Sequence, residues 1–339
     1  MKDISIFLGA NTGRGFRSLY EEYIAGLDLQ RQYVLKGSAG CGKSSLMKRM
    51  AVHADGLGIT TIRVLCSGDP DSLDGLILPE LRTALFDGTS PHVLEPPLIG
   101  QAGFYVDLSR FYRAPATGLE AWNASYREHY RKAYRYLAAA AQLEGVVRCG
   151  EETRRAIRRR AEALASATLG RGHGSGVVGK YYTDAFTCRG CVTLEESRRA
   201  IAPRLVALRG SPDRADLFLQ TYLQAAGQRG RAVVICPDPR DDRRIAHLLL
   251  PELGFGITAG EGDRRIHLEK LGPPLTAGEK EEQRKLEKTR AALLDAAQAE
   301  LALAKADHDR LEEAARPFID FGGVTALTEE LTGKIFGGV

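Results

Sequence analysis

The segment from Gly37 to Ser44 constrains the fold more than any other part of the chain. It reads GSAGCGKS and completes the pattern G-x-x-x-x-G-K-[ST]. A short β-type run, 33–35, precedes it, and helix-forming residues, 45–50, follow it. In such a strand–loop–helix unit, glycines let backbone N–H groups close around phosphate oxygens, and the positive end of the helix dipole faces the anion. The segment therefore predicts a P-loop, the phosphate-binding turn of an α/β sheet.

The motif predicts a role for its polar residues. Lys43 is expected to reach the β- and γ-phosphates of ATP, and the Ser44 hydroxyl is expected to bind Mg²⁺. The whole loop is expected to contact the nucleotide, through Gly37, Ser38, Ala39, Gly40, Cys41, Gly42, Lys43, Ser44 and Ser45. A glycine-rich turn beside a surface lysine is the less favoured alternative, because the strand and the helix around the loop both fit the motif.

The chain also contains an internal repeat. Five short matches occur in the same order in both halves, and this order indicates a tandem duplication. The matched segments are 12–15 with 187–190, 34–38 with 207–211, 64–66 with 234–236, 69–70 with 238–239, and 78–81 with 250–253.

The second copy lacks the chemistry of the phosphate-binding motif. Ala215 replaces the second glycine, Asp216 replaces the lysine, and Leu217 replaces the hydroxyl residue. A carboxylate directed at a triphosphate repels it. We therefore expect the second copy to keep the fold but to bind no triphosphate, which leaves one ATP site in the chain.

Alternating apolar runs and helical segments predict the α/β class, with two P-loop NTPase-type parallel sheets flanked by helices. Each repeat is expected to carry a helical-hairpin insertion. The first repeat, 1–168, contains its helical insertion at about 119–167, and the second, 181–339, contains a hairpin at about 276–316. The glycine-rich stretch 169–180 is expected to be a flexible linker. We expect the two repeats to pack as a pseudo-dimer.

The helical insertions are the expected contact surfaces for an unidentified protein or small-molecule partner. In the first insertion, aromatic side chains recur every four residues and predict one apolar face. These are Trp122, Tyr126, Tyr130 and Tyr134. Arginines run beside this stripe and favour a solvated face. A nucleic-acid surface is the less favoured alternative, because the net charge of the chain is only +4.

Asp87 is the predicted carboxylate of the Mg²⁺ site. It ends the apolar run 84–86, as in a Walker B strand, where the carboxylate holds the ion through water. The second copy supports this prediction because it places Thr258 at the matching position.

Three further polar residues are candidates for the same site. Asp69 is the alternative metal carboxylate, and it is also a candidate catalytic residue because it follows the next strand. Asp74 is a second candidate base, and His92 is a weaker candidate. Turn formation and helix capping are the competing interpretation of these aspartates.

The sequence predicts a cytoplasmic location without a membrane partner. No apolar run approaches the roughly 20 residues that cross a bilayer, and the N-terminal segment becomes polar too soon for a signal peptide. Six cysteines in such a chain indicate thiols of a reducing compartment rather than a disulfide framework. Cys188 and Cys191 resemble half of a zinc or redox site, but no second cysteine or histidine pair completes it.

Several segments together resemble an uncharacterised bacterial family of tandem P-loop ATPases. They are GANTGRGF at 9–16, the loop region at 33–50, CSGDPDSLDG at 66–75, FDGTSPH at 86–92, and the segments 233–239 and 247–254. The resemblance implies ATP binding and hydrolysis. Family members often keep a working loop in both copies, and this chain departs from that pattern at Ala215, Asp216 and Leu217.

The expected function is ATP hydrolysis at one Mg²⁺-dependent site in the first repeat, with a structural or regulatory second repeat. Two alternatives stay open. One is a nucleotide-dependent switch or scaffold that hydrolyses ATP very slowly. The other is a small-molecule or nucleotide kinase with Asp69 or Asp74 as the base. Steady-state turnover distinguishes the first alternative, and transfer to an acceptor distinguishes the second.

Overall fold

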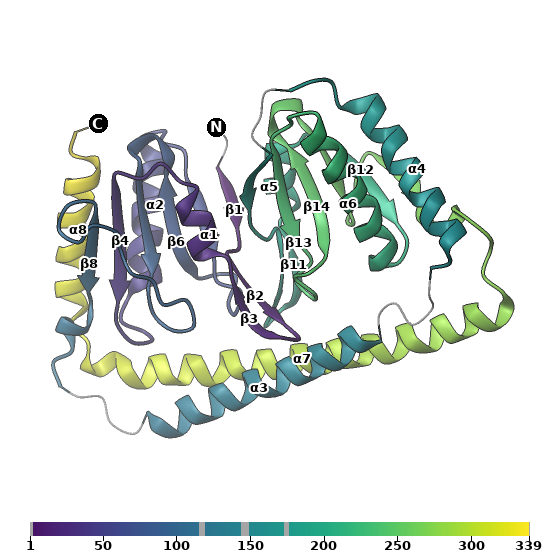
Figure 1. Ribbon diagram of the computed structural model, residues 1–339. Helices are drawn as coiled ribbons and strands as arrows, with labels where there is room; N and C mark the ends of the chain where they lie inside the picture. Colours follow the sequence, from purple (N-terminus) through teal and green to yellow (C-terminus); the bar gives the residue numbers. More distant parts are fainter. Residues whose placement is uncertain (1–2, 115–118, 144–148, 173–175, 339) are drawn as a thin grey trace.

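The chain folds into two six-stranded sheets flanked by helices, which confirms the predicted α/β class (Figure 1). The computed structural model describes residues 3–114, 119–143, 149–172 and 176–338. The first sheet has the order β1-β5-β6-β7-β4-β8. Its strands are β1 (Ile4–Ile6), β4 (Arg31–Lys36), β5 (Ile62–Leu65), β6 (Leu73–Leu78), β7 (Thr83–Asp87) and β8 (Gly103–Asp107).

The second sheet repeats this topology with the order β9-β13-β14-β15-β12-β16. Its strands are β9 (Val177–Lys180), β12 (Arg204–Arg209), β13 (Val233–Pro237), β14 (Ile245–Leu250), β15 (Phe255–Thr258) and β16 (Arg264–His267). Each strand of the first sheet therefore has a counterpart at the same place in the second.

The prediction of purely parallel sheets is wrong in the same way in both halves. Strand β6 runs antiparallel to β5 and β7, and β14 runs antiparallel to β13 and β15. The connections around β6 are the short segments 66–72 and 79–82. A parallel pair needs a crossover of a dozen or more residues, so connections this short impose antiparallel pairing.

The remaining short elements also correspond between the halves. Each half has a two-stranded hairpin, a short helix and the helix that follows the central strand. In the first half these are β2 (Gly9–Thr12), β3 (Gly15–Ser18), α1 (Tyr20–Ala25) and α2 (Lys43–Gly56). In the second half they are β10 (Asp184–Thr187), β11 (Gly190–Thr193), α5 (Glu195–Ile201) and α6 (Pro212–Gln228).

Two long helices, α3 (Glu120–Gln142) and α7 (Ala277–Ala315), lie side by side below both sheets in Figure 1. The aromatic stripe of α3 faces α7: the ring of Tyr126 lies 5.4 Å from that of His308, and Arg310 lies over Trp122. The predicted hairpin at 276–316 is wrong, because α7 is one helix of 39 residues. Its sequence contains no glycine or proline between Gly278 and Pro317 that would break it.

The last helix of each repeat packs on the other half. Helix α4 (Glu151–Thr168) places Ile157 and Ala161 in the core around Phe218 of α6. Helix α8 (Phe321–Phe336) places Leu327 and Leu331 in the core around α2. The core of each half therefore contains a helix from the other half of the sequence. The hairpin predicted for the first insertion is therefore also wrong, because α3 packs on α7 whereas α4 packs on α6. The part of this insertion at 144–148 lies outside the described residues.

Reciprocal contacts at the junction agree with a pseudo-dimer. The backbones of Phe7 and Tyr182 exchange two hydrogen bonds of 2.9 Å. Arg14 of the first hairpin forms an ion pair with Asp242 of the second half. Arg189 of the second hairpin forms one with Asp71 of the first half. Equivalent arginines of the two hairpins therefore pair with carboxylates in the corresponding connection of the other half.

The segment predicted as a linker is partly structured. Within 169–180, residues 177–180 form β9, which pairs with β13 at the edge of the second sheet. Residues 173–175 lie outside the described part of the chain. None of the helices in the described ranges is both long and apolar enough to span a bilayer.

Candidate functional site

The loop at 37–42 joins the buried strand β4 to helix α2. The loop turns back on itself at glycines with left-handed backbone: φ is +76° at Gly40 and +97° at Gly42. Gly42 is also the N-cap of α2 and supplies no side-chain cap. An uncapped helix N-terminus at the end of a glycine loop offers backbone N–H groups to an anion.

Lys43, the first residue of α2, folds back over this loop. Its ammonium group donates hydrogen bonds to the carbonyl oxygens of Gly37, at 2.7 Å, and Ser38, at 3.0 Å. It also lies 3.7 Å from Oδ2 of Asp87. The side chain is buried, so the structure holds a positive charge inside the loop.

Asp87 stands beside the loop because β7 pairs with β4 in parallel, with Asp87 opposite Leu35. Its Oδ1 accepts hydrogen bonds from the backbone N–H and the hydroxyl of Thr89. Ser44 also lies at this edge, where its hydroxyl oxygen accepts the backbone N–H of Leu73 at 2.9 Å. The predicted metal residues Ser44 and Asp87 thus flank Lys43.

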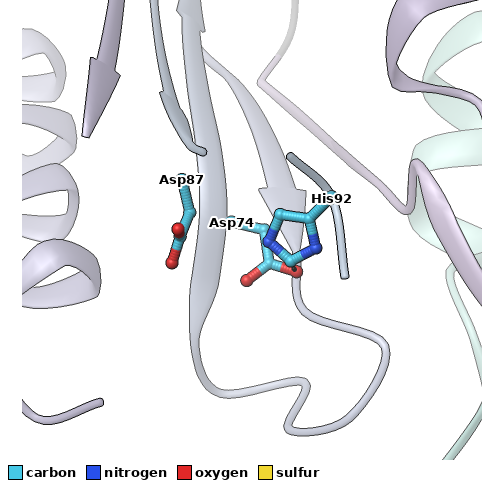
Figure 2. Close-up of side chains that lie close together, drawn as sticks. All are labelled: Asp74, Asp87 and His92. Atoms are coloured by element: carbon cyan, nitrogen blue, oxygen red, sulfur yellow. Dashed lines mark ion pairs between the residues drawn. The ribbon is translucent and has the colours of Figure 1, made fainter. Parts of the chain in front are cut away.

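Asp74 and His92 lie next to Asp87 (Figure 2). The carboxylate oxygens of the two aspartates and a ring nitrogen of His92 all lie within 4.8 Å of one another. Burial raises the pKa of Asp74, and the charge of Asp87 raises it further, while His92 and Lys43 act in the opposite direction. Of the weaker sequence candidates, these two are the ones that the structure brings to the loop.

Asp69 has different neighbours. It accepts hydrogen bonds from the Ser72 hydroxyl at 3.0 Å and the Asp71 backbone at 3.2 Å, and its Oδ2 lies 3.5 Å from Nζ of Lys305 on α7. The three-residue cluster at Asp87 contains Asp74 instead. The described contacts of Asp69 are therefore those of a turn residue paired with α7.

Sequence reasoning missed the residues that cover the loop. The N–H of Gly40 donates to Oε1 of Glu312 on α7 at 3.1 Å, across 272 positions of sequence. A Cβ atom at Gly40 would lie only 3.2 Å from the Cα of Glu312, so α7 packs directly on the loop. Tyr112 adds a hydrogen bond between its hydroxyl and that of Ser38. No local pattern around Glu312 or Tyr112 signals these contacts.

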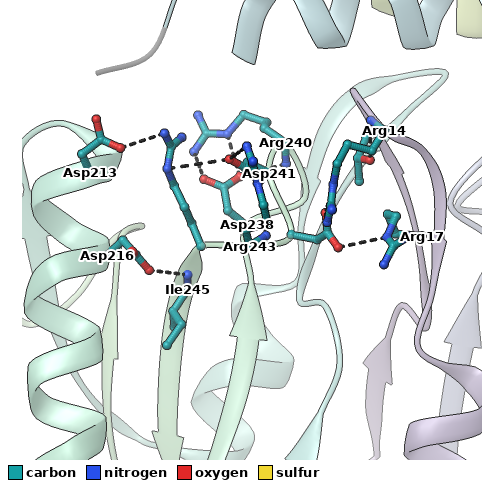
Figure 3. A network of polar contacts seen from close by, with 12 residues as sticks. Arg14, Arg17, Asp213, Asp216, Asp238, Arg240, Asp241, Arg243 and Ile245 are labelled. Atoms are coloured by element: carbon teal, nitrogen blue, oxygen red, sulfur yellow. Dashed lines mark hydrogen bonds and ion pairs between the residues drawn. The ribbon is translucent and has the colours of Figure 1, made fainter. Parts of the chain in front are cut away.

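The corresponding turn of the second half has no comparable loop. Helix α6 begins at Pro212, with Ser211 as its N-cap directly after Gly210. Asp216 accepts the backbone N–H of Ile245 at 2.8 Å (Figure 3). Leu73 and Ile245 are the first residues of β6 and β14, so this bond corresponds to the bond from Leu73 to Ser44. Asp216 therefore takes the place of Ser44 rather than that of Lys43, which corrects the sequence alignment by one residue.

The acidic residues in and beside this turn form ion pairs with arginines of the second half. Asp213 pairs with Arg244 at 2.7 Å, and Asp241 pairs with Arg243 at 2.7 Å. Figure 3 shows Asp213, in the first turn of α6, together with Asp241 and Arg243.

The strand registers also correct one sequence alignment. Thr258 pairs with Ala207 on β12, whereas Phe86 pairs with Val34 on β4. Since 34 and 207 are matched positions of the repeat, Thr258 corresponds to Phe86. The residue after it, Ala259, then corresponds to Asp87. The second half lacks the carboxylate at this position, although threonine is not its replacement.

Comparisons with family models, with curated protein sequences and with solved structures gave no match to this chain.

Proposed function

We propose that this chain is a tandem P-loop NTPase-type protein that binds and hydrolyses ATP at one Mg²⁺-dependent site in its first half. The observation that carries the proposal is the position of Lys43. Its ammonium group is held inside the 37–42 loop and beside the strand-ending Asp87. A lysine, a glycine-rich anion loop and a neighbouring carboxylate are the parts that phosphoryl-transfer sites of this class require.

The residues present fit a nucleotide with Mg²⁺. Mg²⁺ prefers oxygen ligands, and the Ser44 hydroxyl and the Asp87 carboxylate supply them. A hydroxyl oxygen has two lone pairs, so Ser44 retains one beyond the bond from Leu73. When bound, the ion would neutralise charge on the phosphates. Lys43 would exchange its bonds to loop carbonyls for bonds to phosphate oxygens.

Glu312 sets a condition on this function. Its carboxylate accepts the hydrogen bond of the Gly40 N–H, which is one of the groups that would bind a phosphate. Two anions do not share one donor without cost, so nucleotide binding requires Glu312 to leave the loop. Because Glu312 lies on α7, which runs below both sheets, the same movement would reach the second half.

This coupling supports a second candidate, the nucleotide-dependent switch. Binding would displace α7 from the loop, and slow hydrolysis would set how long the displaced state lasts. The switch and the ATPase share one binding site and differ only in turnover.

Calorimetric titration of the full chain with a non-hydrolysable ATP analogue tests the binding proposal. We expect a stoichiometry near one in the presence of Mg²⁺ and much weaker binding in EDTA. A stoichiometry near two, or no saturable binding, would contradict the proposal. Phosphate release under steady-state conditions then distinguishes an ATPase from a slow switch.

A further inference from the structure

The buried side chains of Asp74 and His92 and the half-buried side chain of Asp87 form a group that the nucleotide site does not fully use. Strands β6 and β7 are antiparallel, and Gly75 lies opposite Phe86. The adjacent residues Asp74 and Asp87 are therefore neighbours across the two strands. Like charges directly opposite each other on a sheet repel and destabilise the pairing. The ammonium group of Lys43 lies 3.7 Å from Asp87, and the ring of His92 lies 3.9 Å from Asp74. An additional positive charge would therefore stabilise the two neighbouring carboxylates.

His92 supplies an independent observation. Its side chain is only 8% exposed, and neither ring nitrogen has a hydrogen-bond partner in the described structure. The ring is held in place by stacking on Tyr20, with centroids 5.1 Å apart and planes 11° from parallel. A buried polar group without a partner costs free energy and needs an explanation.

The distance between His92 and Asp74 suits a bridging cation. Nε2 of His92 lies 3.9 Å from Oδ2 of Asp74, which is too long for a hydrogen bond. A metal ion binds imidazole nitrogen and carboxylate oxygen at about 2.0–2.2 Å each, so two ligands of one ion are separated by up to roughly 4 Å. All three ligand atoms lie within 4.8 Å of one another, and Figure 2 shows the ring of His92 beside the carboxylate of Asp74.

We propose that Asp74, Asp87 and His92 bind a divalent transition-metal ion, in preference to Mg²⁺. Imidazole is a favourable ligand for zinc, iron and related ions, and carboxylates also suit Mn²⁺, whereas Mg²⁺ favours oxygen ligands alone. The ion offsets the repulsion between the two aspartates and gives His92 a partner. The site shares Asp87 with the proposed nucleotide site, but it needs no nucleotide to form.

Metal binding to the nucleotide-free full chain tests this proposal. The protein is stripped with a chelator and titrated with Mn²⁺, and free Mn²⁺ is followed by electron paramagnetic resonance. We expect one saturable Mn²⁺ per chain, with Mg²⁺ competing poorly. His92→Gln should weaken binding by at least roughly 10-fold, and His53→Gln, a histidine on the exposed side of α2, should leave it unchanged.

Two further measurements keep the test decisive. Pulsed resonance of bound Mn²⁺ in the wild-type chain should show a ¹⁴N coupling from imidazole, and Asp74→Asn should weaken binding even if His92→Gln does not fold. Lys43→Ala should keep the metal while losing nucleotide, which separates this proposal from the proposed function. Absence of saturable Mn²⁺, absence of the ¹⁴N coupling, or equal affinity for Mg²⁺ would overturn the proposal, and a buried histidine–aspartate contact would then account for the group.

Discussion

The two halves place a strand, a turn and a helix at equivalent positions of their two sheets, but they build the turn differently. In the first half, the loop from Gly37 to Gly42 leaves the N-terminus of α2 uncapped around Lys43. In the second half, α6 begins directly after Ser211 and leaves no such loop. The second copy therefore lacks both the glycine loop and the lysine that lies inside it in the first half.

One contact persists in both halves. The backbone N–H at the start of the next strand donates to the helix, to the Ser44 hydroxyl in the first half and to the Asp216 carboxylate in the second. The duplicated fold therefore keeps the bond that docks the helix on the sheet. Only the first half combines this bond with groups that suit a phosphate.

The largest expected effect is on nucleotide binding by the first half. Lys43→Ala removes the ammonium group that lies inside the loop, so we expect affinity for Mg·ATP to fall by roughly 1,000-fold or more, equivalent to about 4 kcal/mol. Calorimetry with a non-hydrolysable analogue measures the change. Lys48→Ala, an exposed lysine of the same helix, is the matched control. Unchanged binding in Lys43→Ala would mean that the loop does not hold the phosphates.

The next effect concerns a buried ionic group that distinguishes the second half. Arg198 is 1% exposed and pairs with Asp184 at 2.7 Å, while His247 lies 2.5 Å from the other oxygen of that carboxylate. Removing one partner of a buried pair leaves an uncompensated charge. Arg198→Met should therefore lower the free energy of unfolding by roughly 3–5 kcal/mol, measured by urea titration.

The exposed pair between Arg265 and Glu261 gives the control for this substitution. Arg265→Met should change the free energy of unfolding by less than about 1 kcal/mol. Equal effects of the two substitutions would show that burial of the pair of Arg198 and Asp184 adds nothing to its contribution.

The same group predicts a pH dependence. Burial alone would raise the pKa of Asp184, but the neighbouring His247 and Arg198 outweigh it and hold the pKa of Asp184 well below its ordinary value. A depressed carboxyl pKa stabilises the folded state fully above the pKa of the unfolded chain, about 3.9, and this contribution is lost as the pH falls further. Urea midpoints between pH 6 and pH 3 should fall more steeply for the wild type than for Asp184→Asn. Parallel curves would contradict the assignment.

A smaller effect is expected where α7 covers the first-half loop. Glu312→Gln removes the negative charge that competes with phosphate at the Gly40 N–H. We expect affinity for the nucleotide to rise about fivefold, or ~1 kcal/mol, the size of one hydrogen bond. Glu313→Gln changes an exposed neighbour and is the control. A loss of affinity in Glu312→Gln would instead assign Glu312 to the bound site.

The smallest effect compares the equivalent bonds of the two halves. Ser44→Ala and Asp216→Ala each remove the acceptor for one backbone N–H, so each should cost about 1 kcal/mol of stability. Only Ser44→Ala should also weaken Mg²⁺-dependent nucleotide binding. If Asp216→Ala changes the nucleotide titration as well, the two halves are functionally coupled at this bond.

The parts of the site that the sequence predicted are those held close together by local structure. Lys43 and Ser44 follow a strand and open a helix, and Asp87 ends a strand that reaches the same sheet edge. The approach of Asp74 and His92 to Asp87 depends on β6 running antiparallel. The alternating pattern of the sequence did not reveal this direction, because a buried strand has apolar residues on both faces whichever way it runs.

The sequence by itself determined the α/β class, the repeat and the absence of the glycine–lysine motif from the second copy, since each depends on residue types within short segments. Tertiary structure alone decided which helix covers which core and what covers the loop. Helices α4 and α8 present apolar faces that either half would bury, because the hydrophobic effect is proportional to area and has no direction. Their exchange, and the contact of Glu312 with Gly40, follow from the geometry of the long α3–α7 pair, which joins residues far apart in the chain.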